Sequence, residues 1–127
     1  GTVVEIEHKG RPLAIGGTEV PWMGRHPDFR SASRDSFRLL LSHTPDHFAF
    51  AQTQRVDLML AGHNHGGQIV LTVFGPIYGP SRFGVKYAGG VFWKDPTLVY
   101  VSRGISGQHP IRWNCPPELT KLVLRAE

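Results

Sequence analysis

Short apolar segments recur along the chain, and their spacing predicts a fold rich in β-strands. Residues 2–7 (TVVEIE) alternate between apolar and polar side chains and are rich in β-branched residues, which predicts a strand. Lys9-Gly10 favours a tight turn, so residues 12–17 are the expected second strand of a hairpin. Residues 19–32 contain two prolines and little periodicity, and we expect a loop with one helical turn.

Two short apolar runs in the middle of the chain predict a pair of buried strands, at residues 37–42 and 57–61. Between them, Thr44-Pro45-Asp46 is typical of a helix start, with the threonine as N-cap and the aspartate favourable to the helix dipole. A helix from there to about Gln54 completes a strand–helix–strand unit. The two strands should therefore be parallel, with a right-handed crossover.

The remainder of the chain reads as β-structure within one domain. Further strands are expected at residues 68–73, 85–93, 98–101 and 119–125, with a Gly/Pro-rich loop over 74–84. The length of 127 residues fits one domain or part of one, and 15 glycines with 10 prolines predict frequent turns. A hydrophobic content of 40% excludes a disordered chain, and apolar runs of about six residues are too short to span a bilayer. The predicted fold class is α/β, sheet-rich.

Three histidines directly follow the two central strands. His43 comes after the first strand, and His63 and His65 come after the second in the sequence GHNHGG. The carboxyl ends of parallel strands share one edge of a sheet, which is where open α/β sheets bind ligands. Imidazole is the commonest metal ligand and suits Zn, Fe, Ni and Cu. The histidines therefore predict a metal site, and an extended backbone at the H-x-H step would point both rings the same way.

Positive charge surrounds this region. The net charge is +4, and between Asp57 and Asp95 there is no acidic side chain, while Arg82, Lys86 and Lys94 are basic. This segment could present a positive field to an anionic substrate or be a solvated face.

Arg103 follows another apolar strand, so its guanidinium is a candidate for a phosphate contact or for a structural salt bridge. Aromatic residues lie among the basic ones, and they either form a nucleic-acid stacking surface or pack a loop onto the sheet. We favour packing. The aromatic residues are Phe74, Tyr78, Phe83, Tyr87, Phe92 and Trp93.

Other polar residues receive structural interpretations. Asp57 is expected to cap the start of its strand and not to bind metal. Cys115 cannot form an intrachain disulfide, because it is the only cysteine, and it is expected to be structural. The remaining histidines show no partner pattern and are taken as surface or structural residues: His8, His26, His47 and His109.

Four segments resemble a known family. Residues 40–46 (LLSHTPD) and 57–68 (DLMLAGHNHGGQ) are similar to the last two motifs of the calcineurin-like metallophosphoesterases. Residues 100–104 (YVSRG) and 112–118 (RWNCPPE) resemble the tail of one bacterial branch of that family. The family commonly has threonine between its two histidines, where Asn64 stands here.

The resemblance implies that residues 1–127 form the C-terminal half of a four-layer αββα sandwich. The family's first three motifs, D-x-H, G-D-x-x-D and G-N-H-D/E, do not occur in these residues. By resemblance, His43 and His63 bind one metal ion and His65 binds the other, while Asn64 and Arg103 contact substrate. The family's proton-donating histidine lies in the missing motifs.

The implied activity is hydrolysis of phosphate mono- or diesters with two divalent ions, of Mn, Fe, Zn or Ni. The expected partners are a phosphoester substrate, the N-terminal half of the domain, and a second copy in a dimer or domain-swapped form. Two alternatives stay open: a non-catalytic metal-binding module and a basic nucleic-acid-binding β domain, the latter testable by salt-dependent DNA binding. Members of the bacterial branch often carry an upstream membrane or export segment, so the resemblance implies membrane association of the full-length protein, with the cytoplasm as the alternative.

Overall fold

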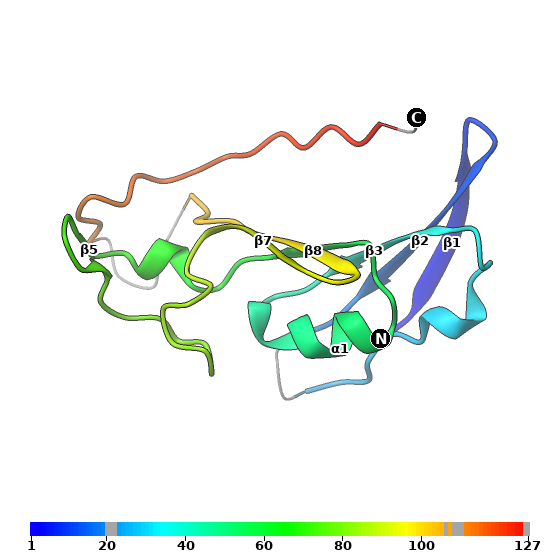
Figure 1. Cartoon of the computed structure of the whole chain (residues 1–127), viewed down its shortest axis with the longest axis horizontal. Helices are drawn as coiled ribbons and strands as arrows, with labels where there is room; N and C mark the ends of the chain where they lie inside the picture. Colours follow the sequence, from blue (N-terminus) through cyan, green and yellow to red (C-terminus); the bar gives the residue numbers. More distant parts are fainter. Residues whose placement is uncertain (20–22, 106, 108–110, 126–127) are drawn as a thin grey trace.

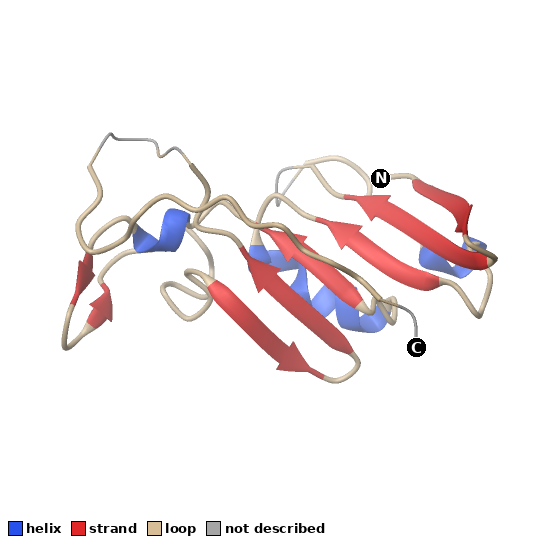
Figure 2. Ribbon diagram, turned by 90° about the horizontal axis from the view of Figure 1, so that it is seen from above, coloured by secondary structure: helices blue, strands red, loops and turns tan. Residues whose placement is uncertain are grey.

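The computed structural model describes residues 1–19, 23–105, 107 and 111–125. Its main feature is a mixed six-stranded sheet with the strand order β1-β2-β3-β4-β8-β7 (Figures 1 and 2). The strands are β1 (Val3–His8), β2 (Arg11–Gly17), β3 (Phe37–Leu41), β4 (Leu58–Ala61), β7 (Gly90–Lys94) and β8 (Thr97–Val101). A separate two-stranded sheet pairs β5 (Val70–Leu71) with β6 (Gly75–Pro76). In the described residues, no helix is long and apolar enough to cross a membrane.

The predicted hairpin and the predicted strand–helix–strand unit are both confirmed. β1 and β2 are antiparallel around the Lys9-Gly10 turn, and β3 and β4 are parallel neighbours. β2, β3, β4 and β8 form a continuous parallel block, so their carboxyl ends lie at one edge of the sheet. This edge carries the segments with the candidate histidines.

The helical connection between β3 and β4 begins as the sequence predicts. The Thr44 side chain accepts a hydrogen bond from the Asp46 backbone N–H at 3.3 Å, and Pro45 opens the first turn. That turn, η2 (Pro45–His47), is a 3₁₀ turn, and it leads into the short helix α1 (Phe48–Thr53). Figure 1 shows this helix lying against one face of the sheet.

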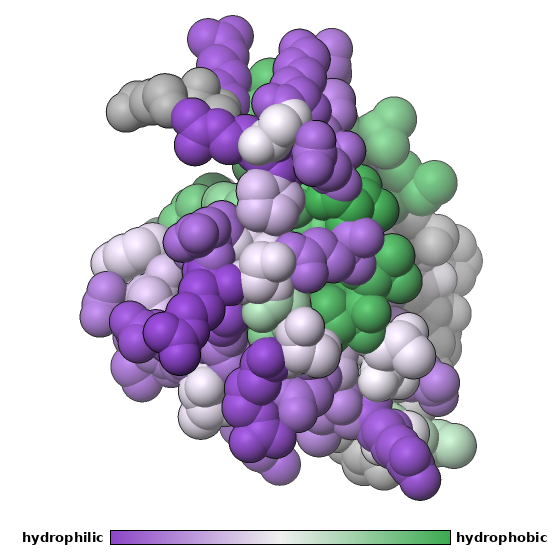
Figure 3. All heavy atoms as spheres, turned by 90° about the vertical axis from the view of Figure 1, so that its right-hand side faces the viewer, coloured by the Kyte–Doolittle hydropathy of each residue, from purple (hydrophilic) through white to green (hydrophobic). Residues whose placement is uncertain are grey.

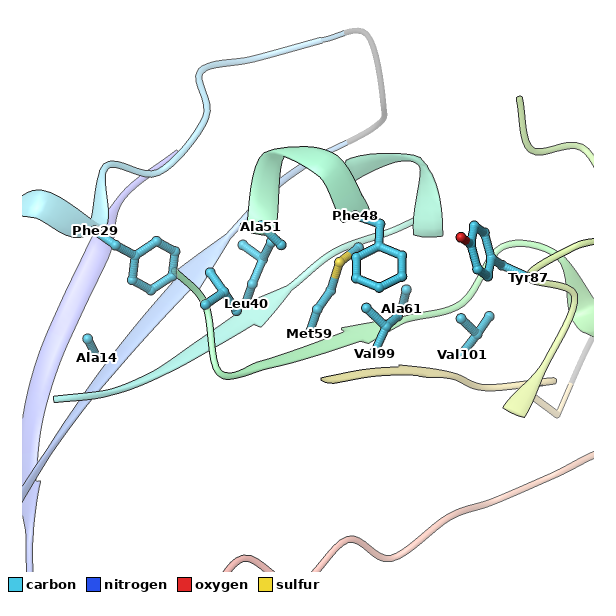
Figure 4. Packing of buried hydrophobic residues seen from close by; sticks show 11 residues of the cluster. Ala14, Phe29, Leu40, Phe48, Ala51, Met59, Ala61, Tyr87, Val99 and Val101 are labelled. Carbon is cyan, nitrogen blue, oxygen red and sulfur yellow. The ribbon is translucent and has the colours of Figure 1, made fainter. Parts of the chain in front are cut away.

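The hydrophobic core fills the space between α1 and that face of the sheet. Leu40, Met59 and Val99 come from three adjacent strands at paired positions and are completely buried. Phe48 and Ala51 of α1 pack onto them (Figure 4). Farther along the same face, Phe29 of the 3₁₀ turn η1 (Phe29–Ser31), the one helical turn expected in residues 19–32, covers β2.

Leu40→Ala should strongly destabilise the fold, whereas the neighbouring Leu41→Ala should not. Leu40 is fully buried under α1, and truncation of such a side chain costs about 2–5 kcal/mol of unfolding free energy. Leu41 points to the opposite face and is 46% exposed, so its truncation should lower the free energy of unfolding by less. Urea unfolding of the two variants tests this difference, and equal midpoints would contradict the assignment of the core to the α1 side.

The opposite face of the sheet is also apolar but has no helix over it. One register row across the six strands consists entirely of apolar residues: Val4, Ile15, Leu39, Leu58, Leu98 and Trp93. A second row contains Leu41, Leu60, Tyr100 and Val91. Val4, Leu41, Val91 and Trp93 are 46–65% exposed. Seen from the end of the molecule that carries β1 and β2, apolar side chains gather in a patch (Figure 3). We refer to these two rows as the open face.

The C-terminal segment crosses the open face without joining the sheet, and the strand predicted for residues 119–125 is wrong. Figure 1 shows the segment extended along the side of the sheet opposite α1. Tyr100 on the open face contacts Glu118 and Thr120 through its hydroxyl. A segment that lies over a face, and not beside an edge strand, cannot form a backbone ladder. The alternating apolar residues of the segment predicted pairing with a neighbouring strand, and its position over the face of the sheet excludes that pairing.

Two other predicted strands are much shorter than expected. Residues 68–73 contribute only β5, because η3 (His65–Gly67) and the left-handed Gln68 (φ 55°) precede it. Residues 85–89 form turns, and pairing with β8 starts only at Gly90.

Candidate metal centre

His43 and His63 meet at the carboxyl edge of the sheet, as the sequence predicts. His43 lies two residues after β3, and His63 lies two residues after β4. His43 Nε2 and His63 Nδ1 are 2.9 Å apart, and the ring centroids are separated by 4.6 Å. The parallel register of β3 and β4 brings together two residues 20 positions apart in the chain. Two ring nitrogens are therefore directed at the same region of space.

The backbone between the two histidines of the H-x-H step is a tight turn and not extended. His63 and His65 have φ values of 72° and 49°, and Asn64 between them is helical. Left-handed conformations are unfavourable for residues other than glycine and concentrate at functional sites. The turn closes with a hydrogen bond of 2.7 Å from the Gly67 N–H to the Asn64 carbonyl. The two rings therefore do not project in the same direction by strand geometry.

His65 lines a pocket of about 470 Å³ together with His63, Tyr78 and Pro80. Within the described residues, no three His, Cys, Asp or Glu side chains are grouped closely enough to hold a metal ion. The structure thus brings two of the three predicted ligands into contact and places the third beside them. The assignment of all three as metal ligands stays a prediction.

The backbone of His65 is held by the C-terminal segment. Its carbonyl accepts hydrogen bonds from the Cys115 thiol at 3.3 Å and from the Arg112 guanidinium at 3.3 Å. Arg112 also donates to the carbonyls of Arg103, at 2.8 Å, and of Gly104, at 3.3 Å. Buried Cys115 therefore has the structural setting that the sequence predicts, whereas the role of Arg112 was not predicted.

Asn64 is buried beside the histidines, and substrate contact by its side chain stays a prediction. The side chain is 1% exposed, and its amide nitrogen donates to the Tyr87 carbonyl at 2.8 Å. Its amide oxygen is buried and has no hydrogen-bond partner among the described residues. The geometry shows Asn64 tying the H-x-H turn to the segment before β7.

Arg103 forms a salt bridge, the structural alternative considered for it. Its Nε donates to Glu118 at 2.7 Å, and its aliphatic stem packs against the turn after His65. Gly66 makes this packing possible: it has a φ of 68°, and a Cβ there would lie 2.5 Å from the Cys115 sulfur. Phosphate contact by Arg103 stays a prediction. In this structure the Nε of its guanidinium binds Glu118.

The stability that the salt bridge between Arg103 and Glu118 adds to the fold should depend on pH. Hydrogen bonds from Tyr100 and Arg103 lower the pKa of Glu118 to about 2, from 4.5. Because the folded pKa is lowered, the stabilising contribution is complete above pH 4.5 and is lost as the pH falls towards 2. Glu118→Gln should therefore lower the urea midpoint at pH 7 and have a shrinking effect below pH 4.5. A difference that stays constant down to pH 2 would contradict the ion pair.

Electrostatic surroundings favour a neutral His63. Burial lowers the pKa of His63, and the nearby rings of His43 and His65 lower it further. Asp46 and a hydrogen bond to the Pro80 backbone act in the opposite direction. A lowered pKa keeps the imidazole neutral at pH 7, which is the form that binds metal ions.

Of the basic candidates, Lys94 lies away from this edge. Lys94 pairs with Thr97 at the start of β8, at the end of the sheet opposite the histidines. Lys86 lies 5.3 Å from the centre of the Tyr87 ring. Asp57 accepts a hydrogen bond of 2.7 Å from the Arg38 N–H at the start of β4, which confirms it as a strand cap.

Aromatic packing is confirmed around Tyr87. Its ring makes edge contacts with Phe48, Phe83 and Phe92, which attach the segment before β7 to α1 and the sheet. Phe74, Tyr78 and Trp93 do not follow this interpretation, because they are 65–82% exposed.

Comparison with known proteins identifies the class. The chain is 32% identical over 119 residues to phosphodiesterase YaeI of Escherichia coli, covering 94% of the chain and 44% of that protein. It is 38% identical over 122 residues to the metallophosphoesterase YkuE of Bacillus subtilis, covering 92% of the chain and 42% of the relative. UDP-2,3-diacylglucosamine pyrophosphatase LpxG of Chlamydia trachomatis is 33% identical over 90 residues, 64% of the chain and 27% of the relative. No family model and no solved structure matches.

These similarities place the chain among the metallophosphoesterases. The matched parts are the C-terminal portions of the relatives, and the chain corresponds to that portion of a metallophosphoesterase. It spans less than half the length of these curated relatives. The mixed sheet with few helices is consistent with part of such a fold.

The residues present fit part of a metal site. The imidazole nitrogens of His43 and His63 converge on each other, and imidazole is a suitable donor for divalent transition metals. Such ions need three or more ligands, and the described residues bring only two into contact. The donor set therefore matches a metal site that other residues complete.

Proposed function

We propose that this chain supplies histidine ligands to a two-metal centre that hydrolyses phosphate mono- or diesters. The observation that carries the proposal is the contact between His43 Nε2 and His63 Nδ1 at the carboxyl edge of the sheet. Similarity to a phosphodiesterase and to a metallophosphoesterase supports the reaction class. The metal ions are Mn, Fe, Zn or Ni in this proposal.

The residues at the carboxyl edge of the sheet have distinct roles in this proposal. His43 and His63 hold one ion, and His65, on the other side of the tight turn, contributes to the second. Bound divalent ions would neutralise phosphate charge and generate a nucleophile from water at neutral pH. Asn64 and Arg112 keep the turn in place from the interior, through Tyr87 and the carbonyl of His65 respectively. No acidic ligand comes from this group of residues.

The proposal requires a partner segment to complete the site and to cover the part of the open face that the C-terminal segment leaves exposed. Metallophosphoesterase relatives are more than twice as long as the matched portion. Parallel strands such as β3 and β4 are normally covered on both faces, whereas here α1 covers only one. An N-terminal half carrying the missing motifs would satisfy both requirements, and isolated residues 1–127 are not competent for catalysis.

Calorimetric titration with Co²⁺ tests the ligand assignment. His43→Ala and His63→Ala should each weaken binding by at least about 10–100-fold, the loss associated with even outer partners of metal sites. His8→Ala is the matched control, because His8 is an exposed histidine at the end of β1. Unchanged affinity in the His43/His63 double variant would overturn the proposal.

A further inference from the structure

The ring of His63 is held from two sides. Its Nδ1 faces His43 at 2.9 Å, and the ring donates a hydrogen bond to the backbone carbonyl of Pro80. A histidine that binds metal usually donates its other ring N–H to a carbonyl or carboxylate, which selects the tautomer and orients the ring. Pro80 is therefore placed to do this for His63. Contacts outside regular secondary structure must hold this carbonyl in place, because residues 77–89 form no strand or helix.

The residues that follow Pro80 are anchored to a buried carboxylate. The Ser81 hydroxyl donates a short hydrogen bond to Asp46, and the Arg82 N–H lies 3.2 and 3.3 Å from its two carboxylate oxygens. Asp46 and Ser81 are 9% and 8% exposed. The Ser81 hydroxyl also accepts from the Phe83 N–H at 3.1 Å, so the anchor is part of a local turn.

Asp46 connects this turn with the loop of the other histidine. It lies three residues after His43, in the first turn of the connection between β3 and β4. A buried carboxylate is costly unless it accepts hydrogen bonds, and Ser81 and Arg82 supply them. Among the described residues, the salt bridges join other partners, Arg30 with Asp28 and Arg103 with Glu118. The negative charge of Asp46 is thus balanced by hydrogen bonds to the turn after Pro80.

We propose that Asp46 is a positioning residue for the candidate metal centre. By holding Ser81 and Arg82, it keeps the Pro80 carbonyl against the His63 ring, so that the two histidines stay aligned. This inference deepens the proposed function and rests on it. The loop at residues 77–89 then has a role in the metal centre. Asp46 acts through His63 and does not bind metal itself.

The test compares Asp46→Asn and Ser81→Ala with Asp57→Asn in the full chain. Asp57 is the matched control, because its carboxylate also accepts a backbone N–H but lies at the opposite end of β4. The first readout is the pair of His63 ring ¹⁵N signals in the metal-free chain, assigned by their loss in His63→Ala. The second readout is the dissociation constant for Co²⁺. Circular dichroism verifies folding of each variant.

Asp46→Asn should convert the single His63 tautomer into a mixture and raise the Co²⁺ dissociation constant about 10–100-fold. Ser81→Ala keeps the contact between Arg82 and Asp46, so its effects should be in the same direction and smaller. If Asp46→Asn does not fold, Ser81→Ala alone tests the positioning role of Asp46. Asp57→Asn should leave both readouts unchanged. Wild-type His63 signals in folded Asp46→Asn or Ser81→Ala would overturn the inference. Absence of Co²⁺ binding by the wild type would count against the proposed function, while the ring signals would still decide the role of Asp46.

Discussion

Residues 1–127 alone should hydrolyse bis-p-nitrophenyl phosphate no faster than buffer, even with Mn²⁺ added. The sequence contains none of the motifs D-x-H, G-D-x-x-D and G-N-H-D/E, which carry the family's bridging carboxylate and proton donor. The described residues bring only two histidines into contact and add no third ligand. A two-metal reaction needs both ions clamped on the reacting phosphate, which two imidazoles cannot do.

The assay requires a control that separates true turnover from contamination. A complete metallophosphoesterase provides the positive control under the same conditions. Turnover by the isolated chain that depends on Mn²⁺ and disappears in His63→Ala would contradict the prediction. It would show that His43, His63 and His65 form a competent site without the missing motifs.

The isolated chain should also associate at micromolar concentration. The open face presents two rows of apolar residues across the sheet, and Leu41, Val91 and Trp93 are 46–65% exposed. Large contiguous apolar surfaces and unpaired edge strands favour association. Sedimentation should therefore give a mass of at least twice 14.1 kDa. The occupant of the open face in this experiment is a second copy of the chain.

A single charge on the open face should reduce this association. Leu41→Glu places a carboxylate at the β3 end of the second apolar row, where the side chain is 46% exposed, so the sedimenting mass should fall towards that of one chain. Phe74→Glu is the control, because Phe74 is 82% exposed but lies outside the six-stranded sheet. A wild-type chain that sediments as a 14.1 kDa monomer and unfolds cooperatively would contradict the reading of this domain as incomplete.

The local pattern was sufficient to predict the central part of the fold. Thr44, Pro45 and the apolar runs on either side carry enough information to place η2, α1 and two parallel strands. The parallel arrangement in turn predicts that His43 and His63 meet, because the ends of parallel strands share an edge. Strand direction alone fixes this meeting of the two histidines, whatever the details of side-chain packing.

Features that depend on distant contacts could not be predicted in this way. The tail at residues 119–125 has the alternation of a strand, but its position over a sheet face leaves no edge for pairing. The link from Asp46 to Ser81 joins residues 35 positions apart, and neither residue carries a local signal for it. Arg112 lies within a segment that resembles the metallophosphoesterase family. Only the structure shows that it donates hydrogen bonds to the carbonyls of His65, Arg103 and Gly104.

Activity in a completed domain tests most directly whether the histidine pair serves metal-dependent phosphoester hydrolysis. The measurement is the rate of bis-p-nitrophenyl phosphate hydrolysis by a protein in which the N-terminal metallophosphoesterase motifs precede this chain. We expect a rate that depends on added Mn²⁺, falls by more than about 100-fold in His63→Ala and is unchanged in His8→Ala. A His63→Ala protein that keeps the full metal-dependent rate would contradict the account.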